Sequence, residues 1–222
     1  MSKILILLDM RLLLLLPAAV ALSRALGHEA WPAHLPIALQ LALAAVIAEF
    51  GSYWLHRLGH ETRPLWRLHA VHHSPQRLYW LNAGREHPLG AIVINTLPIA
   101  PLIALGCTAE CLTLYFALQA VHGLFQHANI DVRLGPLNWV FSMAELHRWH
   151  HSERVEEANH NYGLTLILWD IVFGTRFLPD LRGPSTLGIQ DMPLFPKDFL
   201  RQLTVPFSWN RWVAPSTAND PD

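Results

Sequence analysis

The chain has 222 residues, of which 52% are hydrophobic and 15% are charged, well below the charged share of about 25% that is usual in soluble proteins. This deficit argues against an ordinary soluble protein, and a formal net charge of -1 excludes the basic surface typical of nucleic-acid binding. Two cysteines, Cys107 and Cys111, are too few for a disulfide scaffold and are expected to be buried apolar residues. Residues 1–222 are therefore predicted to form a single membrane domain.

The N-terminal hydrophobic segment, residues 1–34, allows two interpretations. Residues 4–26 form an apolar run long enough to be a first membrane span. The same run fits a signal peptide, with Arg11 ahead of the apolar stretch and the small residues 19–21 ahead of a cleavage site. We favour the uncleaved span, and either interpretation leaves the next helix running from outside to inside.

Three further apolar runs predict a transmembrane core within residues 35–127. The runs are residues 35–55, 89–106 and 111–126. The first, at about 1.5 Å per residue, covers the roughly 30 Å hydrocarbon core, and its polar residues Gln40 and Glu49 are expected to face protein rather than lipid. The second and third predict a helical hairpin in which Pro98 and Pro101 kink the first helix. The sequence thus predicts an all-α, multi-pass bundle of about four spans.

The distribution of arginines predicts how this bundle is oriented. The loop over residues 56–88 contains Arg57, Arg63, Arg67, Arg77 and Arg85, whereas the link over residues 107–110 contains no Lys or Arg. Positive residues mark the cytoplasmic side of a membrane protein. The loop is therefore expected in the cytoplasm, and residues 128–222, rich in Pro, Trp and Phe, are expected to form a cytosolic helical cap and tail.

Histidine is the residue type that departs most from an ordinary composition. The chain has 14 histidines against 16 Lys plus Arg, and most of them fall in short groups between His56 and His160. Histidine is mostly neutral near pH 7 and is the commonest side-chain metal ligand. Neither core packing nor solvation calls for so many in one stretch. His28 and His34 are expected on the opposite side of the membrane, unrelated to a metal site.

Three of the groups have spacings that place their imidazoles on one face of a helix. One is an i, i+4 pair, and two are i, i+3, i+4 triplets. Their members are His56 and His60, then His69, His72 and His73, and finally His147, His150 and His151. A lone pair of histidines is more often structural, but this repetition at one membrane face predicts that all eight bind metal.

A fourth group is looser. His122 and His127 are five residues apart, a step that turns about 140° on an ideal helix, so both cannot share one face unless the helix breaks. His127 ends an apolar run and is the favoured ligand of the two. His122 lies deeper and is included as a further ligand because an unpaired imidazole in lipid is costly. His87 is expected at the membrane interface and His160 in a turn.

The number of donors predicts the number of ions. One ion takes at most about six donors, and these groups offer more than that, so two ions are expected in one cage. Imidazole accepts Fe, Zn, Cu or Ni, and ligand type alone does not name the metal. Glu49 could orient a ligand imidazole or bind metal itself, and Asn161 and Asp170 are further candidates to orient ligand imidazoles. The alternative is a structural role. Glu49 would be a buried acid paired with a polar neighbour, and Asn161 and Asp170 would stabilise turns or cap helices.

The histidine groups resemble the three histidine boxes of the fatty acid hydroxylase / sterol desaturase superfamily, the membrane-bound histidine-box di-iron oxygenases. The flanking residues agree over roughly residues 48–177. The matching stretches are Arg85-Glu86-His87-Pro88, Phe125-Gln126-His127-Ala128-Asn129, the last box with Ser152, Asn161-Tyr162-Gly163, Trp169-Asp170 and Phe173-Gly174-Thr175. Two features depart from the family pattern: Glu145 stands where members often have proline, and the step from His122 to His127 is long.

That resemblance implies a non-haem di-iron centre held by the histidines named above, with no catalytic group beyond the metal ligands. It implies that O2 is a co-substrate and that a C–H bond of a membrane lipid is hydroxylated or desaturated, hydroxylation being favoured. The lipid is left open among a sterol, a fatty acyl chain, an ether lipid and another isoprenoid. Electrons would come from a separate donor protein or reductase, zinc can replace iron in a purified sample, and the active site would face the cytoplasm.

Two rival functions belong to other classes. A bis-histidine haem protein for electron transfer needs one or two axial histidines per haem on facing helices, so adjacent pairs such as His72-His73 are surplus to it. A zinc-dependent membrane hydrolase needs an acid/base carboxylate like that of an H-E-x-x-H helix, and the sequence has no such motif. A membrane-bound di-iron lipid oxygenase is the function that the sequence predicts.

Overall fold

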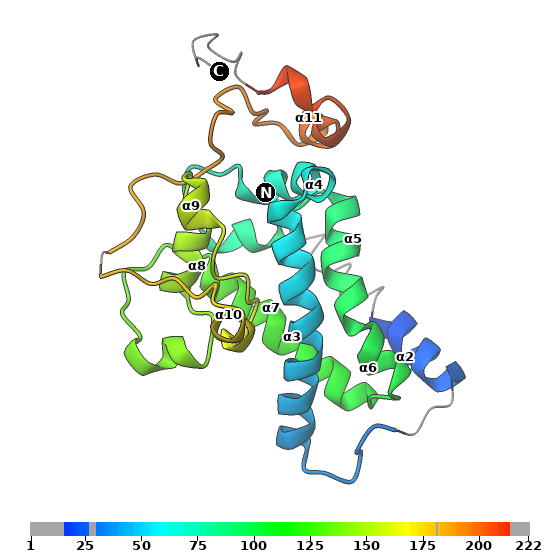
Figure 1. The fold of residues 1–222 in the computed structure, drawn as a ribbon. Helices are drawn as coiled ribbons and strands as arrows, with labels where there is room; N and C mark the ends of the chain where they lie inside the picture. The colour runs from blue at the N-terminus through cyan, green and yellow to red at the C-terminus, as the bar shows by residue number, and fades with distance from the viewer. Residues whose placement is uncertain (1–15, 27–29, 181, 214–222) are drawn as a thin grey trace.

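Helices arranged around one long central helix make up this computed structural model, which describes residues 16–26, 30–180 and 182–213 (Figure 1). The longer helices are α2 (Leu16–Leu26), α3 (Ile37–Glu61), α4 (Arg63–His73), α5 (Pro88–Thr96), α6 (Ala100–Ala104), α7 (Ala109–Gln126) and α8 (Ala144–His150). The shorter α-helices are α9 (Val155–Ala158), α10 (Leu168–Val172) and α11 (Phe199–Gln202). The 3-10 turns are η2 (Trp80–Gly84), η3 (Leu97–Ile99), η4 (Gly135–Trp139), η5 (Val205–Phe207) and η6 (Trp209–Arg211).

The predicted all-α class is confirmed for the described residues, in which the only β-structure is two isolated bridges. These pair Phe141 with Leu166 and Ser152 with Leu187. The choice between a first span and a signal peptide, and the placement of His28, concern residues 1–15 and 27–29, which lie outside the described residues.

Helix α3 is the central element, and it packs against α4, α5, α6, α7 and α10. Within the described residues it is the one helix long and apolar enough to cross a membrane. It runs six residues beyond the predicted run, so that its last turns carry His56 and His60. It ends where Thr62 takes an extended conformation ahead of Arg63-Pro64, and Pro64 in the first turn of α4 suits a helix start.

The two apolar runs after α3 form helices, and the first is interrupted as expected. Residues 88–104 divide into α5, the turn η3 and α6, because Pro98 and Pro101 lack the N–H groups that a continuous helix needs. Pro98 also packs closely on α3, where a Cβ on Gly51 would lie 3.1 Å from its Cα. Thr108 then caps α7 by accepting a hydrogen bond from the Cys111 amide (3.2 Å).

The polar residues that interrupt the long apolar helix face protein. The Gln40 amide oxygen accepts from the Trp31 indole N–H (2.8 Å), and its NH2 donates to the Leu35 carbonyl (2.8 Å). Glu49 accepts the backbone N–H groups of Leu164 and Thr165, both at 3.1 Å. An unsatisfied polar group is costly in an apolar environment, so these contacts fix the position of α3 relative to residues 31–35 and to residues 164–165. Both cysteines are buried and free, as expected.

Residues 128–180 form short elements beside α3, with α8, α9 and α10 gathered on one side of it and α5, α6 and α2 on the other (Figure 1). The turn at residues 160–163 is the most constrained part of this region. Asn161 has a φ of 55° and donates to the Leu146 and Phe177 carbonyls. Asp170 accepts the N–H groups of Tyr162 and Gly163, each at 2.8 Å. This is the turn chemistry expected of Asn161 and Asp170.

We predict that Gly163→Ala lowers the stability of the protein by about 1–3 kcal/mol, because a Cβ there would lie 2.2 Å from the Leu166 carbonyl oxygen. Gly123→Ala on α7 is the matched control, since a Cβ there has no neighbour within 4 Å and alanine favours the helix. Thermal unfolding in detergent measures both. Equal melting temperatures for the two variants would contradict the tight turn.

Candidate metal centre

The histidines of the repeated groups converge on two compact clusters. Within each cluster every residue offers one ligand atom, and these atoms lie within 4.8 Å of one another. The five members of cluster A are His56, His60, His69, His73 and His150, and the four members of cluster B are His72, His127, His147 and His151. Eight of the nine are buried, and only His60 is partly exposed.

Each H-x-x-H-H triplet serves both clusters. On α4, His69 and His73 belong to cluster A while His72 belongs to cluster B. On α8 and its C-cap the division is reversed, with His150 in cluster A and the other two members in cluster B. A helix that lies between two sites can contribute ligands to both from one turn. Positions i and i+4 point toward one site, and position i+3 is rotated about the helix axis toward the other. Each triplet thus contributes potential ligands to both clusters.

Backbone and amide oxygens hold many of the imidazoles from behind. Their Nδ1 atoms contact oxygen atoms, and the pairs are His56 with Tyr162 O (2.7 Å), His150 with His160 O (2.8 Å), His127 with Gly123 O (2.8 Å), His72 with Arg85 O (3.2 Å) and His60 with Asn159 Oδ1 (3.2 Å). These oxygens can only accept, so in each pair Nδ1 carries the proton and donates. The neutral imidazole then has a lone pair on Nε2, which is the tautomer that a metal ligand needs.

The Nε2 atoms of these rings meet at short distances. Those of His56 and His150 lie 2.9 Å apart. Those of His72 and His127 lie 3.2 Å apart. With Nδ1 protonated in all four rings, each contact brings two lone pairs together, which is repulsive unless a cation lies between them. Two nitrogens bound at about 2.1 Å to one ion and at right angles are about 3.0 Å apart, so the donor set fits a metal ion in each cluster.

Burial keeps these rings neutral. It lowers the pKa of His127 to about 4. It also lowers the pKa of five others well below the usual value, with neighbouring imidazoles adding to the effect: His69, His73, His147, His150 and His151. A neutral imidazole offers its lone pair without competition from a proton and leaves the charge of a bound ion uncompensated. The arrangement therefore favours a strongly electrophilic metal pair.

His122 is placed outside both clusters. Its Nε2 faces the Ser142 carbonyl (2.9 Å), a contact that already provides a partner for an imidazole in an apolar helix. Helix α7 stays helical up to Gln126, so the five-residue step turns His122 away from His127. The geometry gives no support to the prediction that His122 binds metal.

The other histidines also lie apart from the clusters. His87 caps α5: its Nδ1 accepts from the Leu89 amide, and its Nε2 donates to the Leu203 carbonyl (both 3.2 Å). His160 contributes only its carbonyl, to His150. His34 is exposed.

The candidate orienting residues act through the backbone rather than on the imidazoles. Asn161 and Asp170 shape the turn whose carbonyls hold His56 and His150, and Glu49 anchors the chain just after that turn. Sequence reasoning missed the contact of the Asn159 side chain with His60. It also missed the carbonyl partners, because any residue supplies a carbonyl and no residue type marks one.

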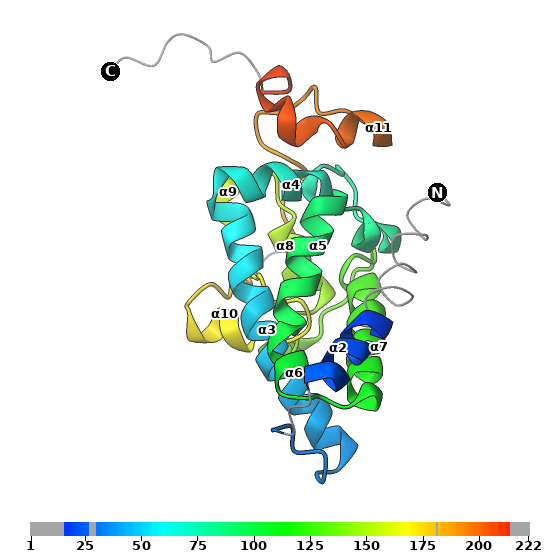
Figure 2. The ribbon, with the colours of Figure 1, turned by 90° about the vertical axis from the view of Figure 1, so that its right-hand side faces the viewer.

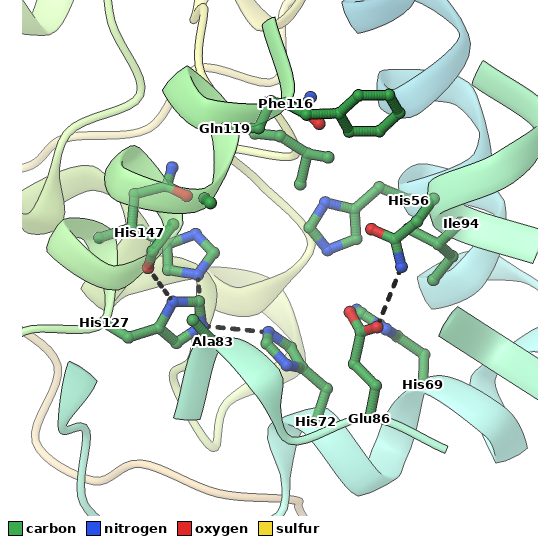
Figure 3. Close-up of a pocket in the computed structure, with 15 residues that line it drawn as sticks. His56, His69, His72, Ala83, Glu86, Ile94, Phe116, Gln119, His127 and His147 are labelled. Carbon is green, nitrogen blue, oxygen red and sulfur yellow. Dashed lines mark hydrogen bonds between the residues drawn. The ribbon is translucent and has the colours of Figure 1, made fainter. Parts of the chain in front are cut away.

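A cavity of about 100 Å³ opens over both clusters (Figure 3). Its floor contains five imidazoles drawn from both clusters: His56, His69, His72, His127 and His147. Its walls come largely from α5 and α7, with apolar side chains including Ile94 and Phe116 and a hydrogen bond from the Asn95 amide to Glu86 (3.1 Å). A molecule in this cavity would face both clusters at once.

Comparison with known proteins gives one family. Residues 41–175 match the family model described as fatty acid hydroxylase. The chain is 44% identical to an ornithine lipid hydroxylase from Rhizobium tropici over 178 residues, which cover 80% of this chain and 53% of that protein. It is 30% identical over 127 residues to human alkylglycerol monooxygenase, covering 57% of this chain and 28% of the relative.

Rat methylsterol monooxygenase 1 is 30% identical over 133 residues, covering 59% of this chain and 44% of the relative. The chain thus spans about half the length of the first of these relatives and less of the others. No solved structure matches the chain.

We predict that His73→Ala and His150→Ala each lower metal affinity at least about 10- to 100-fold, since even removing a partner of a ligand costs that much. The measurement is the amount of metal bound per molecule of purified protein, determined by elemental mass spectrometry. His34→Ala, on an exposed residue, and His122→Ala are expected to keep the full content. The same metal content in all four variants would refute the clusters as ligand sets.

Proposed function

The chain belongs to the fatty acid hydroxylase family, and from this premise we propose that it is a membrane-bound, O2-dependent lipid hydroxylase with two iron ions. The observation that carries the proposal is the pair of histidine clusters beneath one shared cavity. Family membership supports iron over the other metals that imidazole accepts. When bound, the two irons would supply O2 activation and the oxidising power needed to attack an unactivated C–H bond.

The chain's own residues would bind the ions, orient the imidazole rings and exclude water. Nine Nε2 atoms of the two clusters would bind the ions, while an oxygen atom behind five of the rings, such as the Tyr162 carbonyl behind His56, fixes the tautomer of that ring. Burial of eight of the nine rings would exclude bulk water from bound ions, which would protect a reactive centre from side reactions. A substrate carbon in the cavity would lie over both clusters, and apolar side chains of the walls such as Ile94 and Phe116 would contact a lipid.

The membrane arrangement is a further part of the proposal. Helix α3 would cross the bilayer, and the apolar elements α5, α6 and α7 would lie within it beside α3, so that residues 35–127 form the membrane core. The arginine-rich loop would place the clusters at the cytoplasmic edge, with residues 128–222 as a cap and tail over them and residues 1–34 as an N-terminal apolar segment. A lipid would then reach the cavity sideways from the membrane.

Hydroxylation of a lipid R–H to R–OH consumes O2, two electrons and two protons and releases one water. The electrons would come from a separate donor protein. The three relatives are named for ornithine lipid, alkylglycerol and methylsterol, and the highest identity among them is to the ornithine lipid enzyme. An ornithine lipid is therefore the first substrate to test, before an ether lipid or a sterol.

The rival functions are not favoured. A haem with two axial histidines needs space for the macrocycle between them, whereas the Nε2 atoms here meet at about 3 Å, as in His56 and His150 at 2.9 Å. A zinc hydrolase needs a carboxylate that activates a metal-bound water, and the two clusters consist of imidazoles alone.

We expect cells that make ornithine lipid and express this chain to accumulate a lipid with one added oxygen, detected by mass spectrometry. Cells expressing His150→Ala are the matched control and are expected to show none, because cluster A loses a ligand. Alkylglycerol and methylsterol are supplied in parallel cultures. An iron-loaded protein that oxidises none of the three lipids with O2 and a reductant present would contradict the proposed function.

A further inference from the structure

The C-terminal segment over residues 192–213 lies apart from the metal clusters and has an apolar outer surface. It packs inward through Met192, Gln202 and Val205, which are buried. Facing outward, Leu200 is 71% exposed and Phe207 is 77% exposed. Large apolar side chains exposed to this degree on one short segment indicate a surface that contacts something other than water.

This surface is fastened to the end of α5. His87, the N-cap of α5, donates from Nε2 to the Leu203 carbonyl (3.2 Å), and its ring centroid lies 6.4 Å from that of Phe207. The outer face of α5 is itself apolar and exposed at Leu89 and Ile92. Figure 2 shows the segment with α11 above α5. The segment therefore contacts the start of α5, and both carry exposed apolar side chains.

A depression of about 220 Å³ lies in the same segment. The residues that line it are Arg67, Phe207, Ser208, Trp209, Asn210 and Arg211. The Arg67 guanidinium lies 6.0 Å from the Trp209 ring centroid. In the described part of the chain neither Arg67 nor Arg211 has a carboxylate within ion-pair distance, whereas Arg133 and Arg182 each have one. Two positive groups and an amide side chain thus line this depression.

We propose that this depression binds the phosphate of an anionic membrane phospholipid and so holds residues 192–213 on the bilayer surface. Guanidinium groups bind phosphate oxygens in a planar, two-pronged geometry, and the Asn210 amide adds a neutral donor. Phe207 and Trp209 are residue types that favour the membrane interface. The inference uses the bilayer orientation given under the proposed function, which puts the N-terminal end of α5 at the cytoplasmic surface.

Lipid binding would position a part of the molecule that touches the metal cavity. Helix α5 contributes Ile94 and Asn95 to the cavity wall, and the segment holds the start of that helix through His87. Anchoring the segment would therefore steady one wall of the cavity against the bilayer from which the substrate arrives.

The first test measures phospholipid binding to the full chain in detergent, with phosphatidylglycerol as the probe and phosphatidylcholine as the neutral comparison. Arg67→Ala/Arg211→Ala is expected to weaken phosphatidylglycerol binding at least about tenfold, given the usual attraction of each basic residue to an anionic surface. The control Arg133→Ala/Arg182→Ala removes two exposed arginines that already have acidic partners and is expected to change binding less than about twofold. Equal effects of the two double variants would overturn the proposal.

Inorganic phosphate distinguishes a lipid site from a site for a soluble anion. Excess phosphate is expected to leave bound phosphatidylglycerol in place, because the apolar rim at Phe207 favours a lipid. Displacement by phosphate at concentrations similar to those of the lipid would overturn the proposal.

A second measurement does not depend on how the arginine variants fold. Spin labels are attached at Phe207→Cys and Glu156→Cys, and their accessibility to O2 and to a water-soluble nickel chelate is compared in nanodiscs of phosphatidylcholine and phosphatidylglycerol. Both native cysteines are buried and so protected from labelling. The label at 207 is expected to collide more with O2 and the label at 156 more with a water-soluble nickel chelate. Similar collision rates at both positions would overturn the membrane contact. Neither assay reads lipid oxidation, so their failure would leave the hydroxylase proposal to be judged by its own product analysis.

Discussion

The crowding of imidazole lone pairs in a buried space is the constraint on which the rest of this structure depends. Nine rings direct nitrogen atoms into two clusters, and contacts such as that between His56 and His150 at 2.9 Å repel unless a cation separates them. Protonation of one ring in each pair would remove this repulsion, but burial disfavours it because a charged ring in the interior has no counter-ion. Metal ions would resolve the crowding, and their binding would then be linked to the folded arrangement of α3, α4, α7 and α8.

The fold orients five of the nine rings through an oxygen atom that accepts from their Nδ1. Helices supply the rings in rows, but the acceptors that orient them come from elsewhere in the chain, as in the Tyr162 carbonyl that holds His56 across 106 residues. The turn containing Tyr162 is held in its conformation by Asp170, and the chain just after it is anchored to α3 by Glu49. Polar residues inside an apolar bundle thus act at a distance from the metal, by positioning the backbone.

Much of the site follows from sequence because helical spacing is local. The two triplets, the pair on α3 and His127 are brought together as their spacing indicates, and Pro98 interrupts its helix as expected. The division of each triplet between two clusters depends on where α4 and α8 lie in space, which no spacing specifies. The cost of an unpaired imidazole in lipid predicts a partner for His122, but the partner is the Ser142 carbonyl, a tertiary contact that the sequence does not indicate. The number of spans and the cytosolic cap stay predictions.

The most direct test of the two-ion account is X-ray absorption at the iron edge of the purified, iron-loaded protein. We predict iron surrounded mainly by imidazole nitrogens at about 2.0–2.2 Å, the range usual for histidine-bound metals, together with a second iron as a scatterer within a few ångströms. A spectrum with sulfur or porphyrin ligation, or with single iron ions that have no metal neighbour, would contradict the central claim that two adjacent histidine clusters each hold an ion.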